Sequence, residues 1–161
     1  MRQAGLTQYK KEDVLYSYWI ITRECNYDCS YCVCPRLRPN PPDASEETIT
    51  KTIEAYNYLE TQKPVDLVIT GGEPTLKDLP SIFKRLHLSR PIIIFTNLTQ
   101  SVEYYLQLNS IHPIQLYCTL HNTQTSTEDY IDKVNALAPH IKIVAKVMIS
   151  TSKDLVLAQY I

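Results

Sequence analysis

The chain has 161 residues, of which 16 are lysine or arginine and 17 are aspartate or glutamate, so its formal net charge is −1. Because the charges are interspersed, the sequence gives no signal for binding nucleic acid or a membrane surface. The length suffices for one domain with a hydrophobic core, but a complete eight-stranded β/α barrel typically needs about 250 residues. The polar segment 1–13 does not resemble a secretory signal peptide, and no apolar run approaches the roughly 18 residues of a membrane-spanning helix.

The cysteine pattern favours a metal site over a disulfide framework. The chain has five cysteines, and four of them fall within residues 25–34. An odd number in a tight cluster is typical of a metal site in a reducing compartment rather than of a secreted protein. We therefore expect a cytoplasmic protein.

The chain alternates between segments typical of strands and segments typical of helices. Strands are expected at residues 16–22, 65–70, 91–96, 114–120 and 141–149. Helices are expected at residues 45–62, 79–88, 101–108, 126–138 and 154–161. Regular alternation of this kind predicts a parallel sheet with right-handed crossovers. We divide the chain into an N-terminal extension, residues 1–15, and a core domain, residues 16–161, which we expect to be incomplete at its C-terminus.

Three of the expected strands, at 65–70, 114–120 and 141–149, have one apolar face and one mixed face. In the strand at 114–120, Leu116 and Cys118 lie on the apolar face, whereas Tyr117 and Thr119 lie on the mixed face. Parallel strands buried on both sides are usually apolar throughout. The alternation therefore predicts an open, partial β/α barrel of about five β/α units with a partly polar interior.

Unusual residues gather where the expected strands end. The cysteines follow the first strand, Gly71-Gly72-Glu73-Pro74 follows the second, Thr96-Asn97 ends the third, and Thr119-Leu120-His121 ends the fourth. The C-terminal ends of parallel strands meet at the edge where α/β folds build their active sites. We expect a ligand site there.

Cys25, Cys29 and Cys32 have the spacing C-x3-C-x2-C directly after the first strand. Three thiolates can hold three irons of a [4Fe–4S] cube and leave the fourth iron open for chemistry. Two alternatives stay open. Cys34 as a fourth ligand would make the protein a ferredoxin-like electron carrier, and a zinc site completed by Cys34 or a histidine would make it a structural module.

With Tyr31 before the third cysteine and Gly71-Gly72-Glu73-Pro74 farther along, the motif resembles that of the radical S-adenosylmethionine (radical SAM) superfamily. The resemblance implies that the three cysteines hold a [4Fe–4S] cluster whose open iron binds SAM. It further implies reductive cleavage of SAM to a 5′-deoxyadenosyl radical, which abstracts hydrogen from an unidentified small-molecule or peptide substrate. A one-electron donor of the flavodoxin or ferredoxin type would be the partner. Within the same superfamily, a glycyl-radical-enzyme activase is an alternative.

The resemblance also implies which residues bind SAM. Gly71 and Gly72 permit close backbone approach, and a backbone carbonyl and the Glu73 side chain of the Gly-Gly-Glu-Pro74 segment accept hydrogen bonds from the SAM ammonium. Tyr31 would help line the adenine side of the site. Further candidate cofactor contacts are Thr96, Asn97 and Thr119, of which the first two resemble a pair found near the SAM ribose or the substrate.

His121 and Lys146 are the candidate catalytic residues. His121 is a proton donor, a substrate contact or a satisfied core histidine. Lys146 pairs with the SAM carboxylate or a substrate anion, and pairing with Asp66 across the interior is the alternative. The last strand, at 141–149, would be an exposed edge, so we expect a homo-oligomer, a partner at this edge, or cover from residues 1–13.

Overall fold

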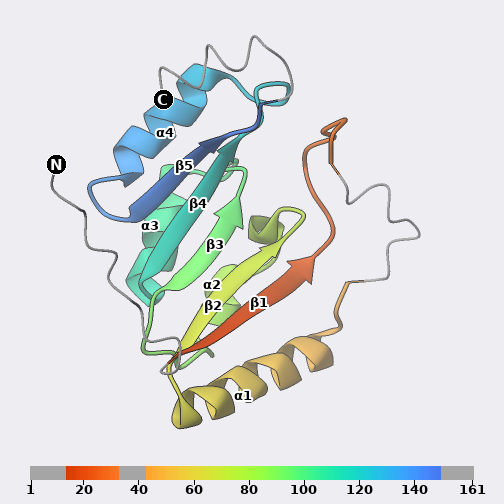
Figure 1. Cartoon of the computed structure of the whole chain (residues 1–161), viewed down its shortest axis with the longest axis vertical. Coiled ribbons are helices and arrows are strands. Elements are labelled where there is room, and N and C mark those ends of the chain that lie inside the picture. The colour runs from red at the N-terminus through yellow and green to blue at the C-terminus, as the bar shows by residue number, and fades with distance from the viewer. Residues whose placement is uncertain (1–13, 33–42, 150–161) are drawn as a thin grey trace, which may run out of the picture.

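The computed structural model describes residues 14–32 and 43–149. Its strands form one parallel sheet in the order β1-β2-β3-β4-β5, with bounds Leu15–Thr22, Val65–Gly71, Ile92–Thr96, Ile114–Leu120 and Lys142–Val147 (Figure 1). The α-helices are α1 (Glu46–Gln62), α2 (Leu79–Phe83), α3 (Val102–Ile111) and α4 (Thr127–Leu137), and a 3-10 helix, η2, spans Pro74–Leu76. The predicted open, partial β/α barrel is confirmed.

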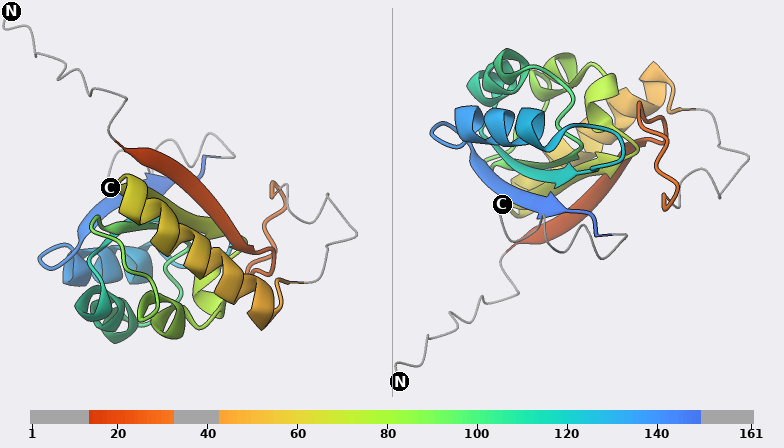
Figure 2. Two further views of the ribbon diagram at one scale, coloured as in Figure 1. Left: turned by 90° about the horizontal axis from the view of Figure 1, so that it is seen from below. Right: turned by 90° about the horizontal axis from the view of Figure 1, so that it is seen from above.

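The four α-helices of the described residues lie on one side of the curved sheet (Figure 2). The core lies between these layers. In β4, the side chains at 114, 116, 118 and 120 are buried and those between them are partly exposed, as the alternation predicts. The mixed face of the sheet therefore faces away from the helices, which leaves it available to line a ligand site. None of the described helices is long and apolar enough to cross a membrane.

Serine caps set the start of three helices. The hydroxyls of Ser45, Ser101 and Ser126 each accept a hydrogen bond from the backbone N–H three residues later, and an acidic residue stands in each first turn. Both features stabilise a helix N-terminus. At the other end, α3 runs to Ile111 rather than to the expected residue 108, because His112 precedes Pro113 and is the first residue forced out of the helical conformation.

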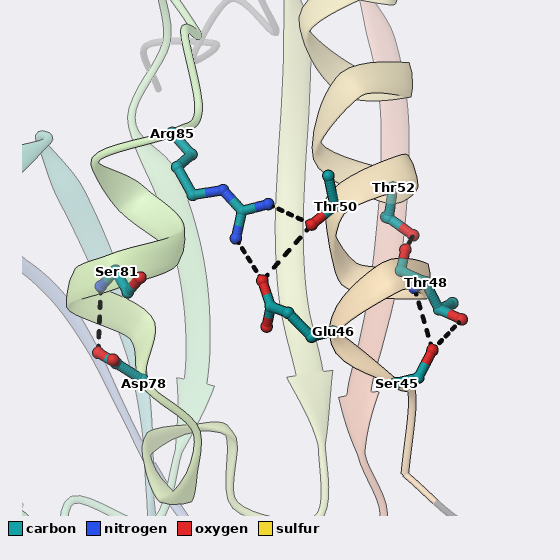
Figure 3. A network of polar contacts seen from close by, with 8 residues as sticks. All are labelled: Ser45, Glu46, Thr48, Thr50, Thr52, Asp78, Ser81 and Arg85. Carbon is teal, nitrogen blue, oxygen red and sulfur yellow. Dashed lines mark hydrogen bonds and ion pairs between the residues drawn. The ribbon is translucent and has the colours of Figure 1, made fainter.

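Helix α2 is shorter than predicted and ends at Phe83 instead of residue 88. The following segment is held by α1 instead of by its own helical bonds. Asn57 of α1 donates to the Arg85 carbonyl at 2.9 Å and accepts from the His87 N–H at 2.8 Å. The Arg85 guanidinium also donates to the Glu46 carboxylate and to the Thr50 hydroxyl, both in the first turns of α1 (Figure 3).

Strand β5 covers residues 142–147 rather than 141–149, and it is an edge within the described part of the sheet. Ile143 and Val147 pack on the core, but Ala145 on the same face is exposed. The expectation that the apolar face of this strand is buried is thus wrong at Ala145 and Ile149, because a strand at the edge has a described neighbour on one side only. The helix expected at 154–161 lies outside the described residues.

Candidate active site

A cavity of about 400 Å³ lies at the C-terminal ends of the strands. Its lining includes ten of the residues predicted to form the site: Cys25, Cys29, Tyr31, Cys32, Gly71, Gly72, Thr96, Asn97, Thr119 and His121. Predicted residues at the C-terminal ends of four different strands therefore meet at one cavity. Cys34 lies outside the described residues.

The segment that follows Thr22 and carries Cys25, Cys29 and Cys32 is called the cysteine loop here. Its start is held next to Asp43. The Thr22 hydroxyl donates to Asp43 at 3.0 Å, and Lys77 pairs with both Asp43 and Glu24. Hydrogen bonding from Lys77 lowers the pKa of the Asp43 carboxyl, so this contact holds a charged pair at neutral pH. The base of the loop is thus fixed independently of anything bound at the cysteines.

The three cysteines differ in exposure: Cys25 is exposed, Cys29 is buried and Cys32 is intermediate. Loss of solvation raises the pKa of the Cys25 and Cys29 thiols, although the Tyr27 N–H, 3.4 Å from the Cys25 sulfur, opposes this at Cys25. A bound metal would overcome the raised pKa, because coordination deprotonates a thiol. Among the described residues, no group of three or more His, Cys, Asp or Glu side chains is close enough to hold a single metal ion. The corner ligands of a cluster stand farther apart than the ligands of one ion, and three thiolates opening on one cavity are the donor set such a cluster uses.

Gly71 and Gly72 lie directly against the start of the cysteine loop. Gly71 has a φ of +139°, and a Cβ added to it would stand 2.0 Å from the Thr22 carbonyl oxygen. A Cβ on Gly72 would stand 2.0 Å from the Glu24 carbonyl oxygen. The Gly72 N–H donates to Thr22 at 2.9 Å. Only glycine fits these two positions, and their backbone borders the cavity.

The Glu73 side chain faces the protein interior. It is 0% exposed and does not line the cavity. Its Oε1 accepts hydrogen bonds from the Thr75 N–H and hydroxyl and from the Thr96 hydroxyl, and its Oε2 accepts from the Asn97 N–H at 2.7 Å. Pro74 is likewise buried, at the start of η2. Neither of these two predicted cofactor residues therefore lines the cavity. Glu73 instead connects the Gly-Gly-Glu-Pro segment to the end of β3.

His121 packs against the cysteine loop. Its Nδ1 is 2.8 Å from the Tyr31 hydroxyl and 3.5 Å from the Cys29 sulfur. Its ring stacks on Tyr31 and meets Tyr27 edge-on. Partial burial lowers the pKa of His121, so the neutral imidazole is favoured at this position.

The chain matches the family model of the radical SAM superfamily over residues 19–151. The chain belongs to the radical SAM superfamily. None of the curated proteins compared with it matches it in sequence. A solved structure with a similar fold is that of BtrN in complex with AdoMet and 2-DOIA, with a TM-score of 0.63 and 18% sequence identity. The match covers 90% of this chain and 58% of the BtrN chain, so this chain spans less than two thirds of that protein. The prediction of a radical SAM enzyme is confirmed at the level of the superfamily.

Lys146, the second predicted catalytic residue of this radical SAM domain, is on β5. It is exposed and does not line the cavity. Its Nζ lies over the rings of Phe95 and Tyr117, 4.5 and 4.7 Å from their centroids. The alternative pairing with Asp66 is wrong, since Asp66 accepts from Arg90.

Four cavity residues of the radical SAM domain were missed in the sequence: Tyr27, Thr70, Phe95 and Met148. Thr70 and Met148 stand on mixed strand faces beside strand ends, so the same alternation that indicated Thr119 could have identified them. Phe95 is an aromatic residue in an apolar strand, and such a residue is usually core. Nothing in the sequence distinguishes it.

Proposed function

We propose that this chain is the catalytic domain of a radical SAM enzyme, with a [4Fe–4S] cluster held by Cys25, Cys29 and Cys32 and SAM bound in the adjoining cavity. The observation that carries the proposal is that all three cysteines and the Gly71-Gly72 turn line one cavity of about 400 Å³. A ligand the size of a nucleoside requires a pocket of a few hundred Å³ or more, so the volume suits SAM beside the cluster.

The cluster and SAM, when bound, would supply a 5′-deoxyadenosyl radical that abstracts hydrogen from a small-molecule or peptide substrate. The chain's own part is to bind, orient and exclude water. Backbone carbonyls at Gly71 and Gly72 are the proposed acceptors for the SAM ammonium, because both glycines line the cavity. Tyr31 is the proposed wall on the adenine side, and Thr96, Asn97 and Thr119 are the proposed polar contacts for the ribose or the substrate.

His121 and Lys146 have different proposed roles. The neutral imidazole of His121 is positioned by Tyr31 and can accept or donate a proton at the cavity wall. The Lys146 ammonium lies on the open face of the sheet, over two aromatic rings, where it can meet an anionic group of SAM or of the substrate. His121 lines the cavity, and Lys146 lies over Phe95, which lines it too.

The proposed partners are a one-electron donor of the flavodoxin or ferredoxin type and a protein surface at β5. The donor is required because cleavage of SAM consumes one electron. The β5 edge presents unpaired backbone groups within the described sheet, together with the exposed side chains of Met148 and Ile149.

The test of the proposed function is formation of 5′-deoxyadenosine. The protein is reconstituted with iron and sulfide without oxygen, then given SAM and a low-potential reductant, and the products are separated by chromatography. We expect 5′-deoxyadenosine from the wild type and from Cys118→Ser, in which a buried core cysteine is changed. A protein that holds iron but forms none, or that holds zinc instead, would favour the electron-carrier or zinc-module alternatives.

A further inference from the structure

A closed ring of hydrogen bonds joins the cysteine loop to the turn after β3. The Asn97 side-chain amide donates to Asn26 Oδ1 at 2.8 Å, and the Asn26 amide donates to the Thr99 hydroxyl at 2.9 Å. The Thr99 hydroxyl then donates to Asn97 Oδ1 at 2.8 Å, which closes the ring. Each of the three side chains both donates and accepts, and the ring connects residues 71 apart in sequence.

The turn that carries Asn97 and Thr99 is fixed from three directions. Glu73 accepts from the Asn97 N–H, and the Lys133 ammonium donates to the carbonyls of Leu98 and Thr99 at 3.1 and 3.3 Å. Leu98 has a φ of +62°, although it is neither glycine nor asparagine, and its side chain is buried in the core. A branched residue stays in the left-handed region only where its surroundings determine the conformation. The ring is therefore anchored on a rigid side, and the cysteine loop is the part it holds.

The residue that the ring holds most directly is Cys25. Asn26 follows Cys25 in sequence, and the Asn97 amide nitrogen stands 4.0 Å from the Cys25 sulfur. The backbone N–H of Tyr27 donates to the same sulfur at 3.4 Å. Cys25 is the exposed member of the three cysteines, so the loop backbone and the ring are what position it. Amide donors at a cluster sulfur favour the reduced, more negative state of the cluster and thereby raise its reduction potential.

We propose that Asn26, Asn97 and Thr99 are positioning residues for the Cys25 thiolate, and that the ring aims the Asn97 amide at its sulfur. This inference rests on the proposed function, because it concerns the cluster held at Cys25. The ring slows loss of iron from that corner and raises the potential at which the cluster accepts an electron. Asn26 and Thr99, which were given no role in the sequence, thereby tune the cluster through the Asn97 amide.

Thr99 offers a matched pair of variants. Thr99→Val keeps the shape of the side chain but cannot close the ring, whereas Thr99→Ser keeps the hydroxyl. Thr123→Val, at an exposed threonine in the loop after β4, controls for the loss of a hydroxyl elsewhere near the cavity. Asn26→Ala opens the ring from the cysteine side. Each protein is reconstituted, its iron loss to a chelator is followed by visible absorbance, and its potential is measured by redox titration with electron paramagnetic resonance detection.

We expect Thr99→Val and Asn26→Ala to lose iron about three- to tenfold faster than wild type, the range that corresponds to one ordinary hydrogen bond. We also expect a more negative potential in both, and wild-type behaviour in Thr99→Ser and Thr123→Val. An unchanged potential in Thr99→Val would overturn the inference even if iron were lost faster, because it would leave the ring a purely structural part of the loop. Equal behaviour of Thr99→Ser and Thr99→Val would overturn it too.

The experiment distinguishes failure of the proposed function from failure of this inference alone. If wild type assembles no cluster, the proposed function is overturned and this inference with it. If wild type assembles a cluster that responds to SAM but the ring variants match it in potential and in iron loss, the inference alone is overturned.

Discussion

Glu73 Oε2 accepts a hydrogen bond from the backbone N–H of Asn97 at 2.7 Å, and this contact joins the segment after β2 to the end of β3. The other oxygen of the same carboxylate accepts from Thr75 and Thr96. A fully buried carboxylate with this many donors acts as a fixed internal anchor, because a buried N–H or O–H that loses its acceptor is destabilising. Glu73 of the Gly-Gly-Glu-Pro motif thus fixes the positions of Thr96 and Asn97, which line the cavity.

The first prediction concerns this anchor. Glu73→Ala should lower the free energy of unfolding of the apoprotein by about 3 kcal/mol, because several buried donors lose their acceptor together. Urea denaturation measures this, with Glu54→Ala, at an exposed acid of α1, as the control. If Glu73→Ala kept wild-type stability and only SAM affinity fell, the carboxylate would contact SAM directly and the anchoring role would be wrong.

The lowered pKa of His121 predicts that the free energy of unfolding depends on pH. Burial lowers its pKa in the folded state, so the folded state disfavours the protonated imidazole relative to the unfolded chain. The resulting stability is present above the unfolded pKa of about 6.5 and is lost as the pH falls through the lower folded value. The free energy of unfolding of the reduced apoprotein should therefore drop between about pH 6.5 and pH 5 more steeply for wild type than for His121→Gln. His87→Gln, at an exposed histidine, is the matched control, and identical slopes for wild type and His121→Gln would contradict the assignment.

Lys146 should matter for binding more than for folding. It is exposed and lies over two aromatic rings, so Lys146→Ala should change the free energy of unfolding by about 1 kcal/mol or less. We expect the dissociation constant for SAM, or the KM of the substrate, to rise about tenfold through loss of a charge-assisted contact. Lys142→Ala removes a lysine on the same face at the other end of β5 and should change neither. Equal effects of the two variants on binding would show that Lys146 has no specific role.

The β5 edge predicts association. Ala145 is exposed there, and Met148 and Ile149 follow the strand with 36% and 47% of their surface exposed. We expect the wild type to sediment as a dimer or with a partner, and Ala145→Asp to weaken association by placing a charge at the edge. Ala55→Asp, on the exposed side of α1, should not weaken it. A monomeric wild type whose β5 amides exchange rapidly, and which still cleaves SAM, would contradict this prediction.

The elements that follow a simple local rule were predicted well from sequence. The predicted helices begin at Ser45, Ser101 and Ser126, which cap α1, α3 and α4 in the structure. The cysteines, Gly71-Gly72 and His121, which were predicted to follow strand ends, line one cavity. The end of α2 was missed, because it depends on Asn57 of another helix, whose side chain donates to the Arg85 carbonyl and accepts from the His87 N–H. The internal role of Glu73 was missed for the same reason. Its partners lie on β3 and η2, and no spacing in the sequence indicates that they converge on one carboxylate.

The central claim is that the cysteine loop holds a cluster with one iron open to SAM. The most direct test is the electron paramagnetic resonance spectrum of the reduced, reconstituted protein recorded with and without SAM. We expect a [4Fe–4S] signal with about four irons per chain that changes shape when SAM is added, and we expect Cys25→Ser, Cys29→Ser and Cys32→Ser each to lose it while Cys118→Ser keeps it. A cluster signal that SAM leaves unchanged in the wild type would contradict the account.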